Sequence, residues 1–381
     1  MLLGLSDDQE FFRETTDRFL TEQAPPDTLR SLRHDPAGFD PGYWRRGAEL
    51  GWTSLLVGEE HGGGTISGAG LVDLSLVAYE FGHHAAPGPL LTTNVVASAL
   101  STHGAAPEVL AELLSGEQIA SWCTPVPGPD GWQPTVTARR EGSALVLRGE
   151  ARLVESAGQA GHLLVTCGEE AGDGGVGVTQ VLVPVGTPGV TRAAMHTVDL
   201  TRRFGIVTFD DATVPPEAVV GVAGEAAADV DRQFQISLVM LNAESVGAMQ
   251  AGFDMTLEWV FDRYSFGRPL ASYQALKHRF ADMLTWLEAS HAISDAACVA
   301  ADTGAPGASE LLSAAKAYLG QYGIALLQDC VQMHGGIGVT FEHDLHLYLR
   351  RMTIDCVLAG TSADHRQHIA AMQGTREEVP A

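Results

Sequence analysis

Three side chains suited to binding a phosphate and a planar ring lie close together in RYSFGRPLASYQALKHRFADM, residues 263–283. They are Arg263, Phe266 and Gln274. Gly267 and Pro269 interrupt the helical period here, because glycine is a poor helix former and proline removes a backbone donor. We therefore expect one helix to end near Tyr264 and the next to begin near Ser272. Taken alone, such a corner is also an ordinary feature of a helical bundle.

A second candidate binding segment is Gln332–Gly338, with the sequence QMHGGIG. Glycines allow a backbone to come close to a ligand, because they carry no side chain. The same glycines are compatible with a loop that simply ends a helix.

One acid stands in a long apolar helical stretch, Glu244 in NAESVG. A carboxylate on an apolar helix face needs a partner or a function, because an unpaired buried charge is costly. Two interpretations follow. Glu244 pairs with an arginine or histidine inside the bundle, or it serves as a proton acceptor.

Together these segments resemble the signatures of the acyl-CoA dehydrogenase family, in which R-x-x-F-G-x-P is followed by a glutamine and by A-D-M. The resemblance implies FAD as cofactor, with its ADP part contacted across a subunit interface by residues of the neighbouring subunit. By position these contacts fall to Arg263, Phe266, Gln274, Gln332, Gly335 and Gly336. Thr361, in the retained Gly-Thr pair of the family's catalytic loop, is a further cofactor-binding candidate.

The resemblance implies α,β-dehydrogenation of an acyl-CoA thioester, which needs a carboxylate base with a raised pKa and donors on the thioester oxygen. In most members the base is a Glu 27 residues after the motif glutamine, and Ala359 stands there. In others it lies 26 residues before the motif arginine, and Ser237 stands there. Glu244, two helical turns beyond Ser237, is the best remaining candidate base.

The segments that contact a chain's own flavin also depart from the family pattern. Residues 124–131, TPVPGPDG, replace T-E-P-x-A-G-S-D, and Leu153-Val154-Glu155 replaces a W-x-T that covers the isoalloxazine and hydrogen-bonds its N5. A buried anion at Glu155 disfavours a reduced, anionic flavin.

The order of helical and strand patterns along the chain predicts an α+β multi-domain protein. We expect an N-terminal α-helical domain over residues 1–118, a middle antiparallel β domain over 119–222 and a C-terminal four-helix bundle over 223–381. This order matches the acyl-CoA dehydrogenase fold that the resemblance implies. Ser6, followed by acids, is expected to cap the first helix.

Composition excludes several classes of function. The formal net charge of −24 and pI of about 4.8 disfavour nucleic acid as a partner. Five scattered cysteines without a C-x-x-C pair argue against a disulfide framework or a zinc site. We expect no membrane span and no secretory signal, and hence a cytoplasmic protein.

Three functions remain open. The chain is an FAD-dependent acyl-CoA dehydrogenase with a displaced base, or the non-catalytic partner that completes the FAD site of a homologous active subunit. A third possibility keeps the fold and alters the chemistry. The resemblance implies a homo- or heterotetramer, an electron-transferring flavoprotein as acceptor, and a branch acting on steroid side chains or other bulky acyl-CoAs.

Overall fold

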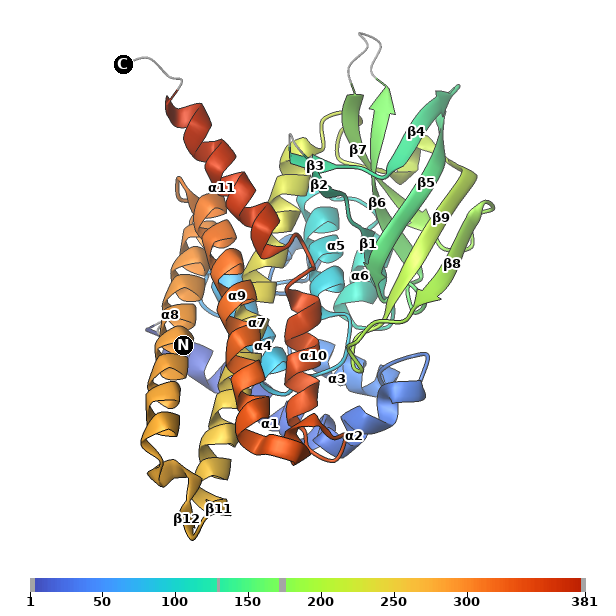
Figure 1. Ribbon diagram of the computed structural model, residues 1–381. Coiled ribbons are helices and arrows are strands. Elements are labelled where there is room, and N and C mark those ends of the chain that lie inside the picture. Colours follow the sequence, from blue (N-terminus) through green and yellow to red (C-terminus); the bar gives the residue numbers. More distant parts are fainter. Residues whose placement is uncertain (1–3, 129–130, 171–175, 378–381) are drawn as a thin grey trace.

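The computed structural model describes residues 4–128, 131–170 and 176–377. Helices extend as far as Leu114, strands run from Ala120 to Val220, and helices resume at Ala227 (Figure 1). The predicted helical, β, helical order is confirmed, while the domain boundaries at 118 and 222 stay a prediction. Within the described residues, no helix combines the length and apolar character needed to cross a bilayer.

The N-terminal part is built from helices whose starts follow local sequence signals. They are α1 (Asp7–Gln23), α2 (Pro26–Ser31), α3 (Pro41–Glu49), α4 (Gly70–His83), α5 (Leu90–His103) and α6 (Pro107–Leu114). The hydroxyl of Ser6 accepts a hydrogen bond from the Gln9 N–H at 3.3 Å, and the Gln9 side chain accepts one from the Ser6 N–H at 3.1 Å. This capping box confirms the predicted start of α1.

The middle part is one twisted sheet with its own apolar core. Its strands are β1 (Ala120–Cys123), β4 (Val136–Glu141), β5 (Ala144–Glu155), β6 (His162–Glu170), β7 (Val176–Pro184), β8 (Val190–Met195), β9 (Phe204–Val214) and β10 (Val219–Val220). The order is β10-β7-β6-β4-β5-β9-β8, with β1 also on β6. The pairs β1–β6 and β4–β6 are parallel, so the prediction of a purely antiparallel sheet was wrong for them.

The segment 124–131, which departs from the family's flavin-contacting pattern, contains the start of a small hairpin. Its strands are β2 (Val126–Gly128) and β3 (Gly131–Gln133), and residues 129–130 lie outside the described ranges. Trp132 of β3 stacks on Phe234 with ring centroids 3.3 Å apart and planes 7° from parallel. The hairpin is thereby packed against the first turns of the long helix that follows the sheet.

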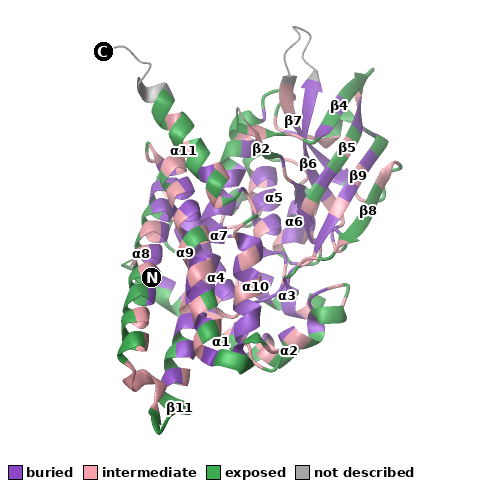
Figure 2. Cartoon of the chain, viewed as in Figure 1, coloured by how far each residue is buried: buried purple, intermediate pink, exposed green. Residues whose placement is uncertain are grey.

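The C-terminal part consists of α7 (Ala227–Asp262), α8 (Gln274–Asp302), α9 (Ala308–His334), α10 (Leu345–Asp355) and α11 (Ser362–Glu377). A short hairpin of β11 (Tyr264–Ser265) and β12 (Arg268–Pro269) joins α7 to α8. The predicted corner is thus confirmed, and it stands at the end of the helices far from the sheet, with exposed residues at its tip (Figures 1 and 2).

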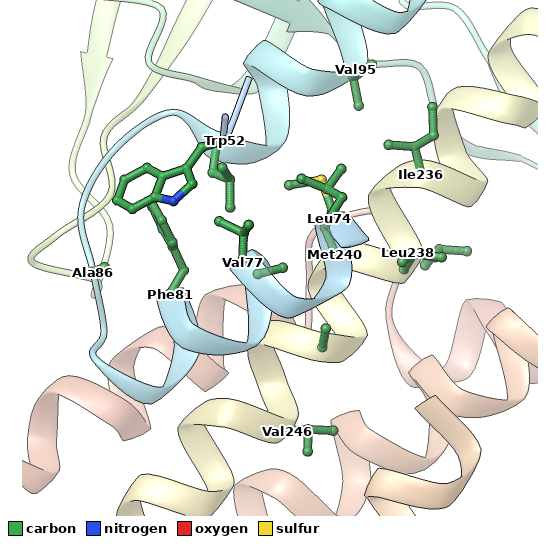
Figure 3. Packing of buried hydrophobic residues seen from close by; sticks show 14 of the residues in the cluster. Trp52, Leu74, Val77, Phe81, Ala86, Val95, Ile236, Leu238, Met240 and Val246 are labelled. Atoms are coloured by element: carbon green, nitrogen blue, oxygen red, sulfur yellow. The ribbon is translucent and has the colours of Figure 1, made fainter. Parts of the chain in front are cut away.

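Helix α7 holds the N-terminal and C-terminal parts together through a shared core. Figure 3 shows Leu74 of α4 beside Met240 of α7, and Trp52 packs edge-on against Phe81 with centroids 5.0 Å apart. All four side chains are buried. Glycines let the two helices touch: an added Cβ at Gly82 would lie 1.8 Å from the Glu244 carbonyl oxygen.

The same close approach occurs from the other side, at Gly247 of α7. A Cβ there would lie 2.0 Å from the carbonyl oxygen of Tyr79. Gly247→Ala should therefore lower the melting temperature by several degrees, since forced overpacking costs about 1–3 kcal/mol. Thermal unfolding followed by circular dichroism measures this.

Gly374→Ala in α11 is the matched control, because an added Cβ there meets no atom within 4 Å. It should leave the melting temperature unchanged or raise it slightly. Equal melting temperatures for both variants and the parent chain would contradict the close approach of α4 and α7.

Candidate functional site

A pocket with an empty volume of about 380 Å³ lies where the sheet meets α5, α7 and the link between α10 and α11. Its lining residues come from all three parts of the chain. They are Leu91, Thr92, Trp122, Thr124, Leu153, Glu155, Arg202, Phe204, Ser237, Leu241, Leu358 and Ala359. The structure thus brings together four positions that the sequence singled out, namely Leu153, Glu155, Ser237 and Ala359.

Neither expected base position offers a base. The hydroxyl of Ser237 donates a hydrogen bond to the carbonyl of Gln233 at 2.9 Å, within its own helix. Ala359 has no polar side-chain atom, and its carbonyl oxygen lies 2.9 Å from Nε2 of His365. Its backbone has a φ of 55°, a left-handed conformation that is uncommon outside glycine.

Glu155 is the carboxylate that lines the pocket. Its Oε1 accepts a hydrogen bond from Nε of Arg202 at 2.7 Å, whereas Oε2 is buried and has no partner among the described residues. Burial raises the pKa of Glu155, and the neighbouring Arg202 guanidinium opposes that rise. The pocket wall therefore carries an ion pair with one free acceptor atom.

Glu244 lies behind the pocket and does not line it. Both of its carboxylate oxygens are bound: Oε2 lies 3.3 Å from Nη1 of Arg202, and Oε1 accepts a short hydrogen bond from Arg351. This is the paired arrangement that the sequence left open. A role as proton acceptor stays a prediction, and the two guanidinium groups oppose it, because a proton would have to displace them.

These contacts belong to a buried ionic network at the junction of the three parts. Nε of Arg351 donates to Asp199 at 2.7 Å, and its Nη2 donates to the Ala86 carbonyl at 2.8 Å. Nη1 of Arg202 donates to Asp355 at 3.0 Å. Burial acts to raise the pKa of Asp199, but the guanidinium groups of Arg351 and Arg202 and the N–H of Thr201 together hold that pKa below its usual value.

Apart from Glu155 and Glu244, the residues of this network were not predicted from the sequence. Asp199 and Arg202 fall in a short polar link before β9, which reads as an exposed loop. Arg351 is the second of two consecutive arginines, and only its position on the apolar side of an amphipathic helix distinguishes it from Arg350. Its side chain is only 1% exposed.

The residues predicted to contact ADP at the corner are open to solvent. Phe266 is 97% exposed and has a positive φ of 49°. The guanidinium of Arg263 lies 5.8 Å from the ring centroid of Trp259, and Gln274 hydrogen-bonds His278 at 3.0 Å on the exposed face of α8. The three side chains thus surround an accessible corner.

The second predicted segment lies beside this corner. Gln332, Gly335 and Gly336 are exposed, and an added Cβ at either glycine meets no atom within 4 Å. The ring of Trp259, which faces the Arg263 guanidinium, also stacks on His334 with ring centroids 5.1 Å apart. The structure therefore unites the two segments into one surface, the corner surface, made by Arg263, Phe266, Gln274, Gln332, Gly335 and Gly336.

Thr361 has a structural partner of its own. Its N–H and hydroxyl both bond Oδ2 of Asp364, at 2.8 and 2.7 Å, and its Oγ1 accepts from the Asp364 N–H at 3.3 Å. This is a reciprocal cap at the start of α11. The side chain of Thr361 is exposed, and its capping of α11 accounts for a threonine at this position without a ligand.

The corner surface cannot serve the pocket of the same chain. Ser237 and Arg263 lie on the same helix, 26 residues apart, which corresponds to about 39 Å at 1.5 Å per residue. A ligand bound in the pocket would have to extend along most of α7 to reach Arg263.

Models of two acyl-CoA dehydrogenase domains match most of the chain: the N-terminal domain over residues 6–117 and the C-terminal domain over residues 228–373. The acyl-CoA dehydrogenase IpdE2 of Mycobacterium tuberculosis is 30% identical over 353 residues, which is 91% of each chain. The solved structure of a Tcur3481-Tcur3483 steroid ACAD has a TM-score of 0.87 at 25% identity, covering 98% of this chain and 99% of that one. The ChsE4-ChsE5 complex from Mycobacterium tuberculosis has a TM-score of 0.85 at 24% identity and full coverage of both chains. The predicted fold is thereby confirmed.

The fit of the chain to FAD differs between its two candidate regions. The corner surface suits the ADP part, since it offers an exposed aromatic ring, a guanidinium, amides and bare glycine backbone. The pocket suits the isoalloxazine poorly. It presents the Glu155 carboxylate where the family has a threonine.

The network predicts a strong effect of Arg351. Arg351→Gln should lower the melting temperature sharply, because removing one partner of a buried ion pair costs roughly 3–5 kcal/mol. Arg350→Gln is the matched control, since Arg350 donates a hydrogen bond to the Val198 carbonyl at 2.9 Å and lies 5.1 Å from the centroid of the Phe341 ring, whereas Arg351 bonds two buried carboxylates. Thermal melts of both variants measure the difference, and similar melting temperatures would show that the network contributes little to stability.

Proposed function

The chain belongs to the acyl-CoA dehydrogenase family, and we propose that it is one subunit of a hetero-oligomeric, FAD-dependent acyl-CoA dehydrogenase. Its role there is to complete the FAD site of a homologous subunit that carries the base. One observation carries the proposal: the corner surface is intact and open, whereas the chain's own pocket has serine and alanine at both base positions.

The corner surface would hold the ADP part of the neighbour's FAD. Arg263 offers charge-assisted hydrogen bonds to phosphate oxygens. Phe266 offers a ring face to a planar group, and Gly335 and Gly336 offer backbone that can approach the pyrophosphate closely. When bound, FAD would accept the hydride that leaves the β carbon of an acyl-CoA. The base of the homologous subunit would accept the proton from the α carbon.

Similar proteins support a heteromer and a bulky substrate. The Tcur3481-Tcur3483 protein, 25% identical to this chain, is described as a steroid ACAD and pairs two named proteins. We extend to this chain the partnership with a second homologue, a tetrameric assembly, and an acyl-CoA with a bulky or steroid-derived acyl group. An electron-transferring flavoprotein is the proposed electron acceptor.

A second candidate is catalysis in the chain's own pocket. The Oε2 of Glu155 favours it, because a buried carboxylate oxygen that meets no partner among the described residues could accept a proton from a ligand. The pairing of the other oxygen with Arg202 weighs against it. The following experiment separates the two candidates.

Purified alone, the chain should be colourless, and it should acquire FAD when co-expressed with a homologue that has Glu at the position of Ala359. In that complex, Arg263→Ala should weaken FAD binding by about 10–100-fold, since hydrogen bonds to charged groups contribute about 1.5–3 kcal/mol. Fluorescence titration with FAD measures the dissociation constant.

Arg268→Ala is the control on the same hairpin. The Arg268 guanidinium lies 3.8 Å from the ring centroid of its own chain's Tyr273, so its loss should leave FAD binding unchanged. A chain that retains stoichiometric FAD alone, and whose flavin spectrum is bleached by an acyl-CoA, would instead establish catalysis in its own pocket.

Glu244→Gln tests the remaining base candidate in the complex. The amide keeps the shape but removes the charge opposite Arg202 and Arg351, so we expect a lower melting temperature and an unchanged kcat. General-base catalysis contributes about 10²–10⁴-fold. A fall in kcat of that size, with the fold and FAD content retained, would restore Glu244 as the base.

A further inference from the structure

Four potential metal ligands converge at the end of α4, away from the pocket and the corner surface. They are Asp17 of α1, Glu80 and His83 of α4, and His84 directly after it. Each offers one ligand atom, and these four atoms all lie within 4.8 Å of one another. We call this group the α1–α4 cluster.

Glu80 is the residue whose position is hardest to explain without a ligand. It is only 5% exposed, and no hydrogen bond reaches its carboxylate from the described part of the chain. Its nearest cation is Arg13, with Nε 3.8 Å from Oε1. Burial and the neighbouring Asp17 raise the pKa of Glu80 to about 8, against the effect of Arg13.

The other carboxylate oxygen faces the two histidines. Oε2 of Glu80 lies 4.0 Å from Nδ1 of His83 and 3.9 Å from Nε2 of His84. Nδ1 of His83 is buried and has no partner within the described residues. Nε2 of His84 lies 2.8 Å from Oδ1 of Asp17. The imidazole nitrogen of His83 that lacks a partner among the described residues therefore lies near a Glu80 oxygen whose contacts to both histidines are long, at 3.9 and 4.0 Å.

We propose that Asp17, Glu80, His83 and His84 bind one divalent transition-metal ion, with Zn²⁺ the best match to this ligand set. Two imidazoles and two carboxylates are ligands that zinc takes in proteins, and the two carboxylates balance its charge. Four protein ligands leave no open position, so the ion has a structural role: it joins α1 to α4. The cysteines, whose number and spacing argued against a zinc site, take no part, because all four ligands are histidines and carboxylates.

The geometry needs only side-chain adjustment. Zinc–ligand bonds of about 2.0–2.2 Å in a tetrahedron separate the ligand atoms by roughly 3.3–3.6 Å. The distances of 3.9 and 4.0 Å to Glu80 would shorten slightly, and the His84–Asp17 hydrogen bond would lengthen as both turn toward the ion. An ion can enter from solvent, since the side chains of Asp17 and His83 are 48% and 33% exposed.

Calorimetric titration of the full-length chain with Zn²⁺ tests the proposal. The parent chain should bind Zn²⁺ and melt at a higher temperature in its presence, because a ligand that binds only the folded state stabilises it. Glu80→Gln and His84→Ala should each weaken Zn²⁺ binding by roughly 10–100-fold or more. Loss of a group that only supports a metal ligand already costs about that much, and these two residues are proposed as ligands themselves. Substitution with Co²⁺ should give the visible absorption of a tetrahedral site.

His103→Ala is the matched control. His103 also faces a carboxylate, with Nε2 3.0 Å from Oδ2 of Asp229, but it belongs to no such cluster. Its loss should leave Zn²⁺ binding unchanged. Zn²⁺ binding that is absent in the parent chain, or that weakens equally in His103→Ala and His84→Ala, would overturn the proposal. Because Glu80→Gln is nearly isosteric, it remains informative if His84→Ala fails to fold.

Discussion

The structure depends on one buried side chain, Arg351, which bonds to all three parts of the chain. It donates to Asp199 in the link before β9, to Glu244 on α7 and to the carbonyls of Ala85 and Ala86 after α4. Burying a guanidinium costs several kcal/mol unless its donors are satisfied. The orientation of the sheet against the helices is therefore tied to the geometry of these bonds, which an apolar contact would not fix so strictly.

The network around Arg351 contains one more carboxyl group than cations. Its members are Glu155, Asp199, Glu244, Asp355, Arg202, Lys316 and Arg351. Burial and the neighbouring Glu244 raise the pKa of Asp355 well above its ordinary value, and Oδ2 of Asp355 has no partner in the described ranges. The network ends at Arg202 and Glu155, so charged groups that hold the parts together also line the pocket.

Local patterns in the sequence were sufficient for most of the fold. Ser6 followed by acids predicted the start of α1, and the positions of Gly and Pro predicted the corner between α7 and α8. The parallel pairs of β6 could not be predicted in this way, because strand pairing is decided by contacts distant in sequence. The same holds for the site. Glu244 could be recognised as an acid that needs a partner, but its partner Arg351 lies 107 positions away and no local signal connects them.

The open corner and the ionic pocket wall differ in how far their groups are paired within this chain. The ring of Phe266 is 97% exposed, which is unusual for a large apolar side chain. Its backbone has a positive φ, which is uncommon for a residue other than glycine. Retaining them is consistent with a ligand or subunit that covers the ring. The pocket shows the reverse: its polar groups are mostly satisfied by one another, and little is left to recognise a ligand. Since about 39 Å separates the two regions along α7, a ligand held in the pocket of the same chain does not cover the corner. The proposed partnership with a homologous subunit would supply a group that covers the Phe266 ring.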